Sequence, residues 1–180
     1  MKIEKTDIKD LVIVEPNVFG DERGYFFESY SKTKFEDLGI NIEFVQDNQS
    51  FSKKGTLRGL HYQNPPFAQT KLVRVLEGEI IDVAVDLRED SPTFGQWFSL
   101  ELTSENKLQL YVPRGFGHGF SVLSDKAVFS YKCDNLYDKA SEGGVLWNDS
   151  DLNIDWKLPL EDIILSDKDQ VLPIFALKNF

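Results

Sequence analysis

Short runs of β-branched and aromatic residues, separated by turns, are the feature that most constrains the fold of this chain. Residues 11–15 (LVIVE), 72–76 (LVRVL) and 80–87 (IIDVAVDL) are typical of strands, and Gly78 lies in the turn of a hairpin between the last two runs. Turns with glycine, proline or aspartate recur at roughly 8–12 residues, the spacing of β-sandwiches and barrels. Because strands do not alternate with helices, the pattern predicts a mainly β fold in one domain over residues 1–180.

Helices are expected to be few and short. The 14 phenylalanines and 6 tyrosines favour strands over helices. Residues 31–38 are predicted to form one helix, with Ser31 or Thr33 as its N-cap and Gly39 after its end. In the tail, residues 159–180, apolar side chains stand near helical spacing at Leu160, Ile163 and Ile164.

The run 80–87 places two acids on one face of an apolar strand. Since side chains alternate along a strand, Asp82 and Asp86 lie on the face opposite to Val83 and Val85. The pattern therefore predicts either that this face is exposed or that it borders a polar cavity.

The overall charge excludes several classes of partner. A net charge of −10 and a pI near 4.7 argue against nucleic acids and anionic membranes, which bind basic surfaces. An anionic small molecule fits only where arginines and lysines gather locally. The single cysteine, Cys133, forms no internal disulfide, which fits a reducing cytoplasm. We expect no signal peptide and no membrane span, because no apolar run approaches about 18 residues.

Residues 56–74 (TLRGLHYQNPPFAQTKLVR) combine several groups able to do chemistry. His61 is one of only two histidines, and Arg58 and Lys71 stand near the two ends of the stretch. Pro65 and Pro66 predict a loop, since proline fixes φ and removes a ladder donor. A neutral imidazole is a usual general base near pH 7, and a desolvated lysine can stabilise an oxyanion. The stretch also fits a half-buried strand histidine bonded to a carbonyl and a lysine whose amine reaches water.

Two further residues in predicted strands are candidates. His118 lies in GFGHGF, where flanking glycines permit close backbone approach, and it also fits a turn histidine. Tyr131 fits a general acid if an adjacent cation favours proton release, and it also fits a packing role. With two histidines in the chain, a metal site of three histidines is impossible within one subunit. A site of two histidines and one carboxylate is allowed by count but has no support in the spacing.

Cations elsewhere in the chain are candidates for phosphate. Arg23 and Arg58 could bind a phosphate bidentately and Lys168 as a point charge, although each also fits an ordinary surface cation. Asp169, by its sequence context alone, would be a solvated loop acid. The chain has no P-loop, no GxGxxG and no GxSxG motif.

Seven blocks cover nearly the whole chain: GDERGYFFESY (20–30), FVQDNQS (44–50), TLRGLHYQ (56–63), KLVRVLEGEIIDVAVDLREDSPTFGQW (71–97), ENKLQLYVPRGFGHGF (105–120), SYKCDNLY (130–137) and SEGGVLWND (141–149). Together they resemble the dTDP-4-dehydrorhamnose 3,5-epimerase family. The resemblance implies a cofactor-free, cupin-type jelly roll (a double-stranded β-helix) with a few short helices, assembled as a homodimer. It implies an enzyme of dTDP-L-rhamnose biosynthesis that converts dTDP-4-dehydro-6-deoxy-D-glucose to dTDP-4-dehydro-L-rhamnose.

The resemblance also implies residue roles. His61 would be the base, oriented by Asp169, while Lys71 would stabilise the enolate and Tyr131 would be the acid on the opposite face of the sugar. Nine residues would bind substrate: Arg23, Phe26, Glu28, Gln46, Asn48, Arg58, His118, Glu142 and Lys168. The first three would contact the nucleotide or diphosphate, and some of the family's contacts come from the partner subunit.

The chemistry fits these residue types. A 4-keto group acidifies the hydrogens on C3 and C5, so a base, a cation at the C4 oxygen and an opposed acid are sufficient, without metal or nicotinamide. Two alternatives stay open on the sequence. One is a related sugar-nucleotide cupin, such as a 3-epimerase or a 3,4-ketoisomerase, and the other is a non-catalytic sugar-nucleotide-binding cupin. Gln49 stands where the family often has histidine, and Leu136 where it often has tyrosine.

Overall fold

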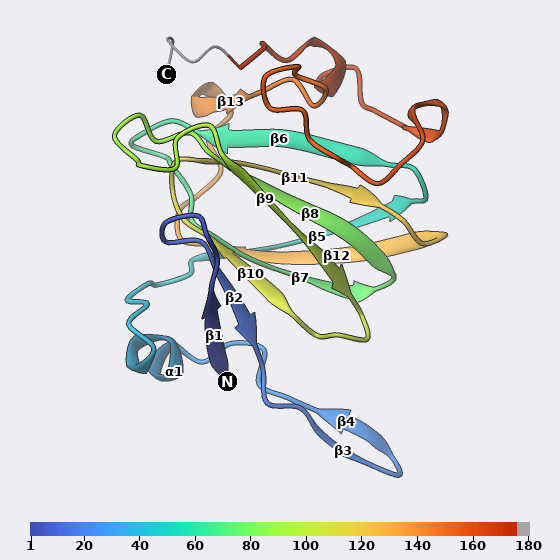
Figure 1. The fold of residues 1–180 in the computed structure, drawn as a ribbon. Helices are drawn as coiled ribbons and strands as arrows, with labels where there is room; N and C mark the ends of the chain where they lie inside the picture. The colour runs from blue at the N-terminus through green and yellow to red at the C-terminus, as the bar shows by residue number, and fades with distance from the viewer. Residues whose placement is uncertain (176–180) are drawn as a thin grey trace.

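Two antiparallel sheets that face each other form the body of the computed structural model, which describes residues 1–175 (Figure 1). The six-stranded sheet has the order β1 (Lys2–Lys5), β2 (Val12–Glu15), β10 (Gln109–Val112), β7 (Lys71–Glu77), β12 (Lys126–Cys133), β5 (Gln46–Lys53). The five-stranded sheet has the order β13 (Glu142–Gly144), β6 (Leu57–Gln63), β11 (Phe116–Val122), β8 (Glu79–Asp86), β9 (Trp97–Thr103). Strands β5 to β8 alternate between the sheets, so the predicted jelly roll is confirmed.

A third, two-stranded sheet extends away from this body. It is the hairpin of β3 (Phe19–Asp21) and β4 (Gly24–Phe26), and its aromatic side chains Phe19, Tyr25 and Phe26 are 60–67% exposed. Figure 1 shows the hairpin projecting beyond the two main sheets. The aromatic run 25–30 has strand character, but only its first two residues lie in β4, because among residues 1–175 no other strand lies beside the hairpin.

Helical structure is sparse, as predicted. The helix α1 (Lys32–Asp37) has Ser31 at its N-cap position, buries Phe35 and is followed by Gly39 at φ +85°. The described residues also contain three 3₁₀ turns: η1 (Lys139–Ser141), η2 (Leu160–Asp162) and η3 (Asp169–Val171). The helical spacing in the tail gives only the turn η2, since Ile164 continues into an isolated bridge with Thr56. None of the helices within residues 1–175 has the length and apolar character needed to cross a membrane.

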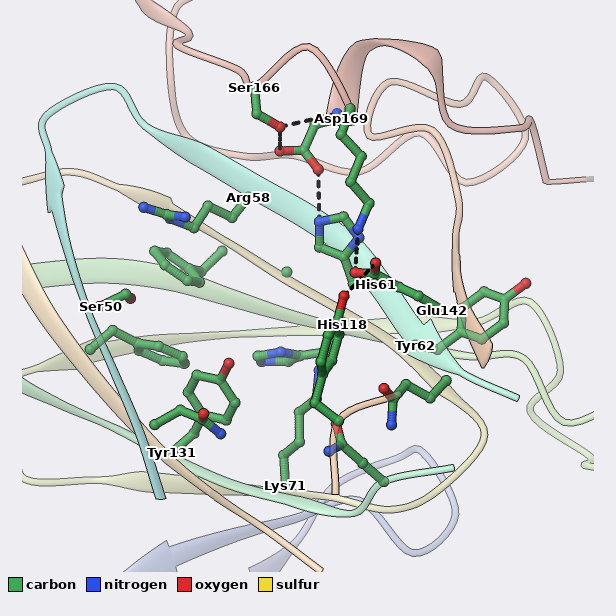
Figure 2. Close-up of a pocket in the computed structure, with 18 of the residues that line it drawn as sticks. Ser50, Arg58, His61, Tyr62, Lys71, His118, Tyr131, Glu142, Ser166 and Asp169 are labelled. Carbon is green, nitrogen blue, oxygen red and sulfur yellow. Dashed lines mark hydrogen bonds and ion pairs between the residues drawn. The ribbon is translucent and has the colours of Figure 1, made fainter. Parts of the chain in front are cut away.

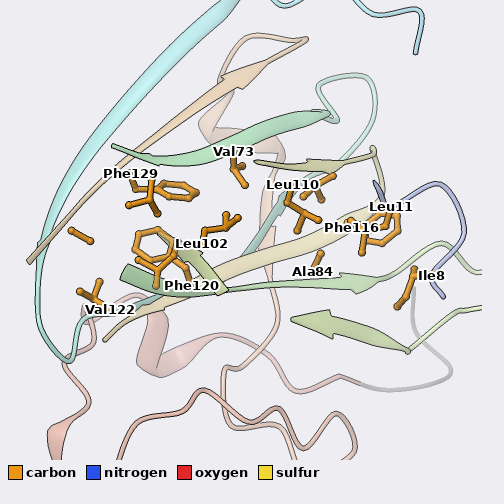
Figure 3. Close-up of a cluster of buried hydrophobic side chains, with 14 residues drawn as sticks. Ile8, Leu11, Val73, Ala84, Leu102, Leu110, Phe116, Phe120, Val122 and Phe129 are labelled. Carbon is orange, nitrogen blue, oxygen red and sulfur yellow. The ribbon is translucent and has the colours of Figure 1, made fainter. Parts of the chain in front are cut away.

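The main core lies between the two large sheets (Figure 3). Fully or nearly fully buried side chains from both sheets meet there, including Val73, Leu102, Leu110, Phe120 and Phe129. A second core lies on the other face of the five-stranded sheet, where the tail from residue 145 onwards covers it.

Strand β8 therefore has two buried faces. Val83 and Val85 pack under the tail, while Ile80 and Ala84 face the other sheet. The exposed face that Asp82 and Asp86 made possible is excluded, because both carboxylates are completely buried. A strand that is covered on both faces is expected to be almost continuously apolar. The two buried carboxylates on β8 therefore need hydrogen-bond or charged partners.

Two glycines allow the closest approach of strands beside the candidate site. Gly59 of β6 has φ +124°, and a Cβ on it would lie 2.5 Å from the Cα of Gly119 on β11. A Cβ on Gly119 would lie 2.5 Å from the carbonyl oxygen of Arg58. Only glycine fits at both positions. This close contact brings His61 opposite His118 in the register of the two strands.

Candidate functional site

A cavity of about 620 Å³ opens between the two large sheets at one end of the core (Figure 2). Ten of the predicted site residues line it: Gln46, Asn48, Arg58, His61, Lys71, His118, Tyr131, Glu142, Lys168 and Asp169. Polar side chains that were not predicted to act there also line it, among them Ser50, Gln63 and Ser166. Residues far apart in the sequence therefore converge on one site.

His61 and Asp169 form a close pair at the wall supplied by the five-stranded sheet. His61 lies on β6, and its Nε2 is 2.7 Å from Oδ1 of Asp169 in the turn η3. The distance is that of an ion pair, although the contact is not aligned as a hydrogen bond. The other ring nitrogen, Nδ1, is buried and has no hydrogen-bond partner among the described residues. The predicted pairing of these residues is thus present, with one imidazole nitrogen left uncommitted.

The carboxylate of Asp169 is held in its charged form although the residue is only 4% exposed. Burial by itself raises the pKa of Asp169. The contact with His61, a hydrogen bond from the Ser166 hydroxyl and one from the backbone N–H of Gly59 outweigh burial and lower that pKa below its usual value. The sequence suggested a solvated loop acid, whereas the structure shows a buried and fixed one.

Lys71 is a half-buried residue at the start of β7 in the six-stranded sheet. Burial lowers the pKa of its ammonium group, and the nearby Cys133, Asp82 and Glu142 partly oppose that shift. Its Nζ lies 6.0 Å from the ring centroid of Tyr131, and within residues 1–175 no carboxylate forms a salt bridge with it. A cation with this environment interacts strongly with any negative charge that develops nearby.

Tyr131 lies on β12, next to Lys71 in the same sheet. Burial raises the pKa of its phenol, the charge of Cys133 raises it further, and the charge of Arg58 lowers it. The phenol therefore keeps its proton at neutral pH, and a cation able to favour proton release stands across the cavity. Figure 2 shows Tyr131 and His61 on opposite sides of the space.

His118 lies deeper, with its imidazole against a buried acid. Its Nε2 is 3.0 Å from both carboxylate oxygens of Asp82, and the two side chains are 6% and 0% exposed. Burial lowers the pKa of His118, and Asp82 opposes that shift. Asp82 does not itself line the cavity, but it contacts His118, which does. Asp86 instead binds Arg88, Ser91 and Thr93 away from the cavity.

The rim of the cavity consists of amides and an ion pair. Gln46 and Asn48 on β5 are joined by a hydrogen bond of 2.9 Å between their side chains. Lys168 pairs with Glu142, whose other oxygen accepts a hydrogen bond of 3.2 Å from the Tyr137 hydroxyl. Tyr137, and not its neighbour Leu136, lines the cavity, so the aromatic side chain at this rim comes from Tyr137.

Three predicted binding residues do not reach this cavity in the single chain. Arg23 lies in the turn of the β3–β4 hairpin, 85% exposed, and pairs with Asp21 at 2.6 Å. Phe26 lies on the same hairpin, and Glu28 pairs with Lys34 near α1. None of the three lines the cavity of its own chain.

Sequence reasoning gave no role to two residues that hold predicted site residues in place. Ser166 bonds to Asp169, and Asp82 bonds to His118. The placement of Asp82 among apolar residues was a usable signal, since a buried acid needs a partner. Ser166 gave no signal beyond its spacing of three residues from Asp169. Within residues 1–175, no three His, Cys, Asp or Glu side chains gather closely enough to hold a metal ion.

Comparison with known proteins places similar sequences in one family. Residues 5–176 match the family model for dTDP-4-dehydrorhamnose 3,5-epimerase. The dTDP-4-dehydrorhamnose 3,5-epimerase of Shigella flexneri is 56% identical over 170 residues, which cover 94% of this chain and 93% of the relative.

Solved structures similar to this chain are also 3,5-epimerases. The crystal structure of dTDP-4-dehydrorhamnose 3,5-epimerase from Elizabethkingia anophelis NUHP1 is 63% identical, with a TM-score of 0.95 and coverage of 100% of this chain and 99% of the other. The dTDP-6-deoxy-D-glucose-3,5-epimerase of Legionella pneumophila Philadelphia 1, in complex with dTDP-4-keto-L-rhamnose, is 51% identical, with a TM-score of 0.92 and coverage of 96% and 92%.

Proposed function

The chain belongs to the dTDP-4-dehydrorhamnose 3,5-epimerase family, and we propose that the cavity between its two sheets is where the epimerisation takes place. Its activity is that of a dTDP-4-dehydrorhamnose 3,5-epimerase in dTDP-rhamnose biosynthesis. The substrate bound in the cavity is a dTDP-linked 4-keto-6-deoxy sugar, as the ligand of the Legionella relative supports.

His61 removes the proton from C3 or C5. Asp169 stands 2.7 Å from Nε2 of His61 and orients the imidazole, which accepts the substrate proton. The electrons of the broken C–H bond move toward the C4 oxygen, which becomes an enolate oxygen. The carboxylate of Asp169 stabilises the imidazolium that forms, in the way a buried acid supports a histidine base.

Lys71 stabilises the enolate oxygen. Its ammonium group is desolvated, and among the described residues no salt bridge neutralises it. The positive charge is therefore free to interact with the enolate oxygen, which becomes negative only after the proton is removed. Groups placed in this way typically lower a barrier by roughly 3–4 kcal/mol.

Tyr131 returns a proton from the opposite face, which inverts the carbon. The observation that carries the proposal is the origin of the two groups: His61 comes from the five-stranded sheet and Tyr131 from the six-stranded sheet, across one cavity. A sugar ring lying between the sheets presents one face to each of them. Inversion needs this opposition, whereas binding alone does not.

Substrate binding falls to the remaining cavity residues. Arg58, His118, Gln46, Asn48, Glu142 and Lys168 offer donors and acceptors for sugar hydroxyls and phosphate. Arg23, Phe26 and Glu28 contribute from the other copy of a homodimer, because the exposed hairpin cannot contact the cavity of its own chain. The residues provide base, oxyanion partner and acid themselves, so the reaction is cofactor-independent.

Proton exchange tests this function directly. Purified protein is incubated with dTDP-4-dehydro-6-deoxy-D-glucose in D₂O, and deuterium at C3 and C5 is followed by NMR. We expect label at both carbons, and label at one carbon only would contradict double epimerisation. His61→Ala should abolish exchange while leaving dTDP binding nearly unchanged. Full exchange in that variant would disprove the role of His61 as base.

A further inference from the structure

Ser166 makes a paired contact with Asp169. Its hydroxyl donates a hydrogen bond of 2.7 Å to Oδ2 of Asp169, and its Oγ accepts one of 3.2 Å from the backbone N–H of the same residue. Because the amide hydrogen already occupies an Oγ lone pair, the hydroxyl proton is directed at the carboxylate. Figure 2 shows Ser166 and Asp169 together behind the imidazole of His61.

The contact fixes which carboxylate oxygen faces the histidine. Oδ2 is taken by Ser166, and Oδ1 is left 2.7 Å from Nε2 of His61. Rotation of the carboxylate would break the serine bond inside a site where Asp169 is 4% exposed. An unmade hydrogen bond to a buried charged group is costly, so the carboxylate has one favoured orientation.

The fold of the turn does not depend on this hydroxyl. The backbone N–H of Gln170 donates to the carbonyl of Ser166 at 3.3 Å, and that of Val171 donates to the carbonyl of Lys168 at 3.3 Å. Ser166 is itself an exposed residue and lies outside the buried cores. Both side-chain hydrogen bonds of Ser166 within the described residues go to Asp169.

We propose that Ser166 is a positioning residue for the epimerisation, holding the Asp169 carboxylate against Nε2 of His61 so that the imidazole keeps its catalytic orientation. The inference rests on the proposed role of His61 and Asp169. Ser166 touches no reacting atom, so its effect passes entirely through Asp169.

Removal of the hydroxyl should impair catalysis more than binding. Ser166→Ala should reduce kcat by roughly 10- to 100-fold with little change in KM, since a small misplacement of a catalytic group can cost about 100-fold. The pKa of Asp169 should rise, because its charged form loses a hydrogen-bond donor. The acidic limb of the pH profile of kcat/KM should therefore move to higher pH. Ser166→Thr keeps a hydroxyl and should restore most of the activity and the acidic limb.

Ser91→Ala is the matched control. Ser91 Oγ likewise donates to a buried carboxylate, at 2.5 Å from Oδ2 of Asp86, and accepts from the backbone N–H of Thr93 at 3.3 Å. Asp86 lies outside the cavity, so this variant should lower the melting temperature without moving kcat or the acidic limb. An effect of Ser166→Ala no larger than that of Ser91→Ala would overturn the inference.

A double-mutant cycle separates this inference from the proposed function. In the Asp169→Asn background, Ser166→Ala should cause no further loss of kcat, since it acts through the carboxylate. Additive losses would show that Ser166 acts elsewhere and would overturn the positioning role. If Asp169→Asn itself retains full exchange, the proposed pair of His61 and Asp169 fails. If it loses exchange while Ser166→Ala does not, only the role of Ser166 fails.

Discussion

Burial shifts the pKa values of Lys71 and Tyr131 in ways that suit opposite tasks. For Tyr131, burial favours the neutral phenol, which is the form that has a proton to give. For Lys71, burial disfavours the ammonium form, and the charge persists at a cost to the folded protein. We therefore expect the desolvated charge of Lys71 to serve catalysis while lowering the free energy of unfolding.

Replacement of Lys71 by methionine should therefore change activity and stability in opposite directions. Lys71→Met should lower kcat by about 10²–10³, the usual effect of losing an oxyanion partner. It should raise the free energy of unfolding at neutral pH. The lysine pKa is lower in the folded state than the 10.5 of an unperturbed side chain, so the unfolded state binds the proton more tightly and is favoured below the folded-state pKa.

Kinetics and urea unfolding at pH 7 measure the two effects. In the unsubstituted protein, the stability penalty from Lys71 should fade as the pH rises toward 10.5. The alkaline loss of kcat should occur at a pH below 10.5, because the pKa of Lys71 is lowered. Lys157→Met, at an exposed lysine outside the cavity, is the control and should change neither quantity appreciably. A loss of both activity and stability in Lys71→Met would instead indicate a structural lysine.

At the scale of elements, the β3–β4 hairpin is the part of the chain whose role its own contacts do not explain. It carries three largely exposed aromatic residues and Arg23, and it projects away from the cavity of its own chain. An exposed apolar surface that a monomer cannot cover commonly marks an interface. A hairpin that reaches the site of a partner copy would account for these residues.

Mixed dimers test this exchange. Arg23→Ala and His61→Ala should each reduce activity when made alone. A dimer with one chain of each kind contains one site with both residues intact if Arg23 acts in the partner's site, so activity should return to roughly half of the unsubstituted value. If Arg23 serves its own chain, no intact site forms and the mixed dimer stays as inactive as its parents. Full activity of Arg23→Ala alone would show that Arg23 serves neither site.

The elements also show how far the sequence could lead. Alternating runs such as 80–87 predicted the strands, and the quoted blocks placed His61, Lys71 and Tyr131 in one site. The short tail turns could not be foreseen, because burial of the outer face of β8 by distant residues such as Trp156 decides the path of the tail. The partners of Ser166 and Asp82 likewise depend on packing that no local spacing encodes.

At the scale of the whole molecule, the jelly roll places two chemically different walls around one space. The five-stranded sheet supplies His61, with Asp169 behind it, and the six-stranded sheet supplies Lys71 and Tyr131. Alternation of consecutive strands between the sheets brings residues 61 and 71 to opposite walls although they are close in sequence. In the proposed mechanism, the fold separates proton removal from proton return across the thickness of a sugar ring.

Deuterium exchange by Tyr131→Phe in D₂O tests this separation most directly. The variant should still let His61 remove a proton and return deuterium to the same face, so recovered substrate becomes labelled. Product should form slower by about 10²–10⁴, the usual contribution of a general acid. His61→Ala, measured beside it, should give neither labelled substrate nor product. Formation of product by Tyr131→Phe at the unsubstituted rate would contradict the assignment of base and acid to opposing sheets.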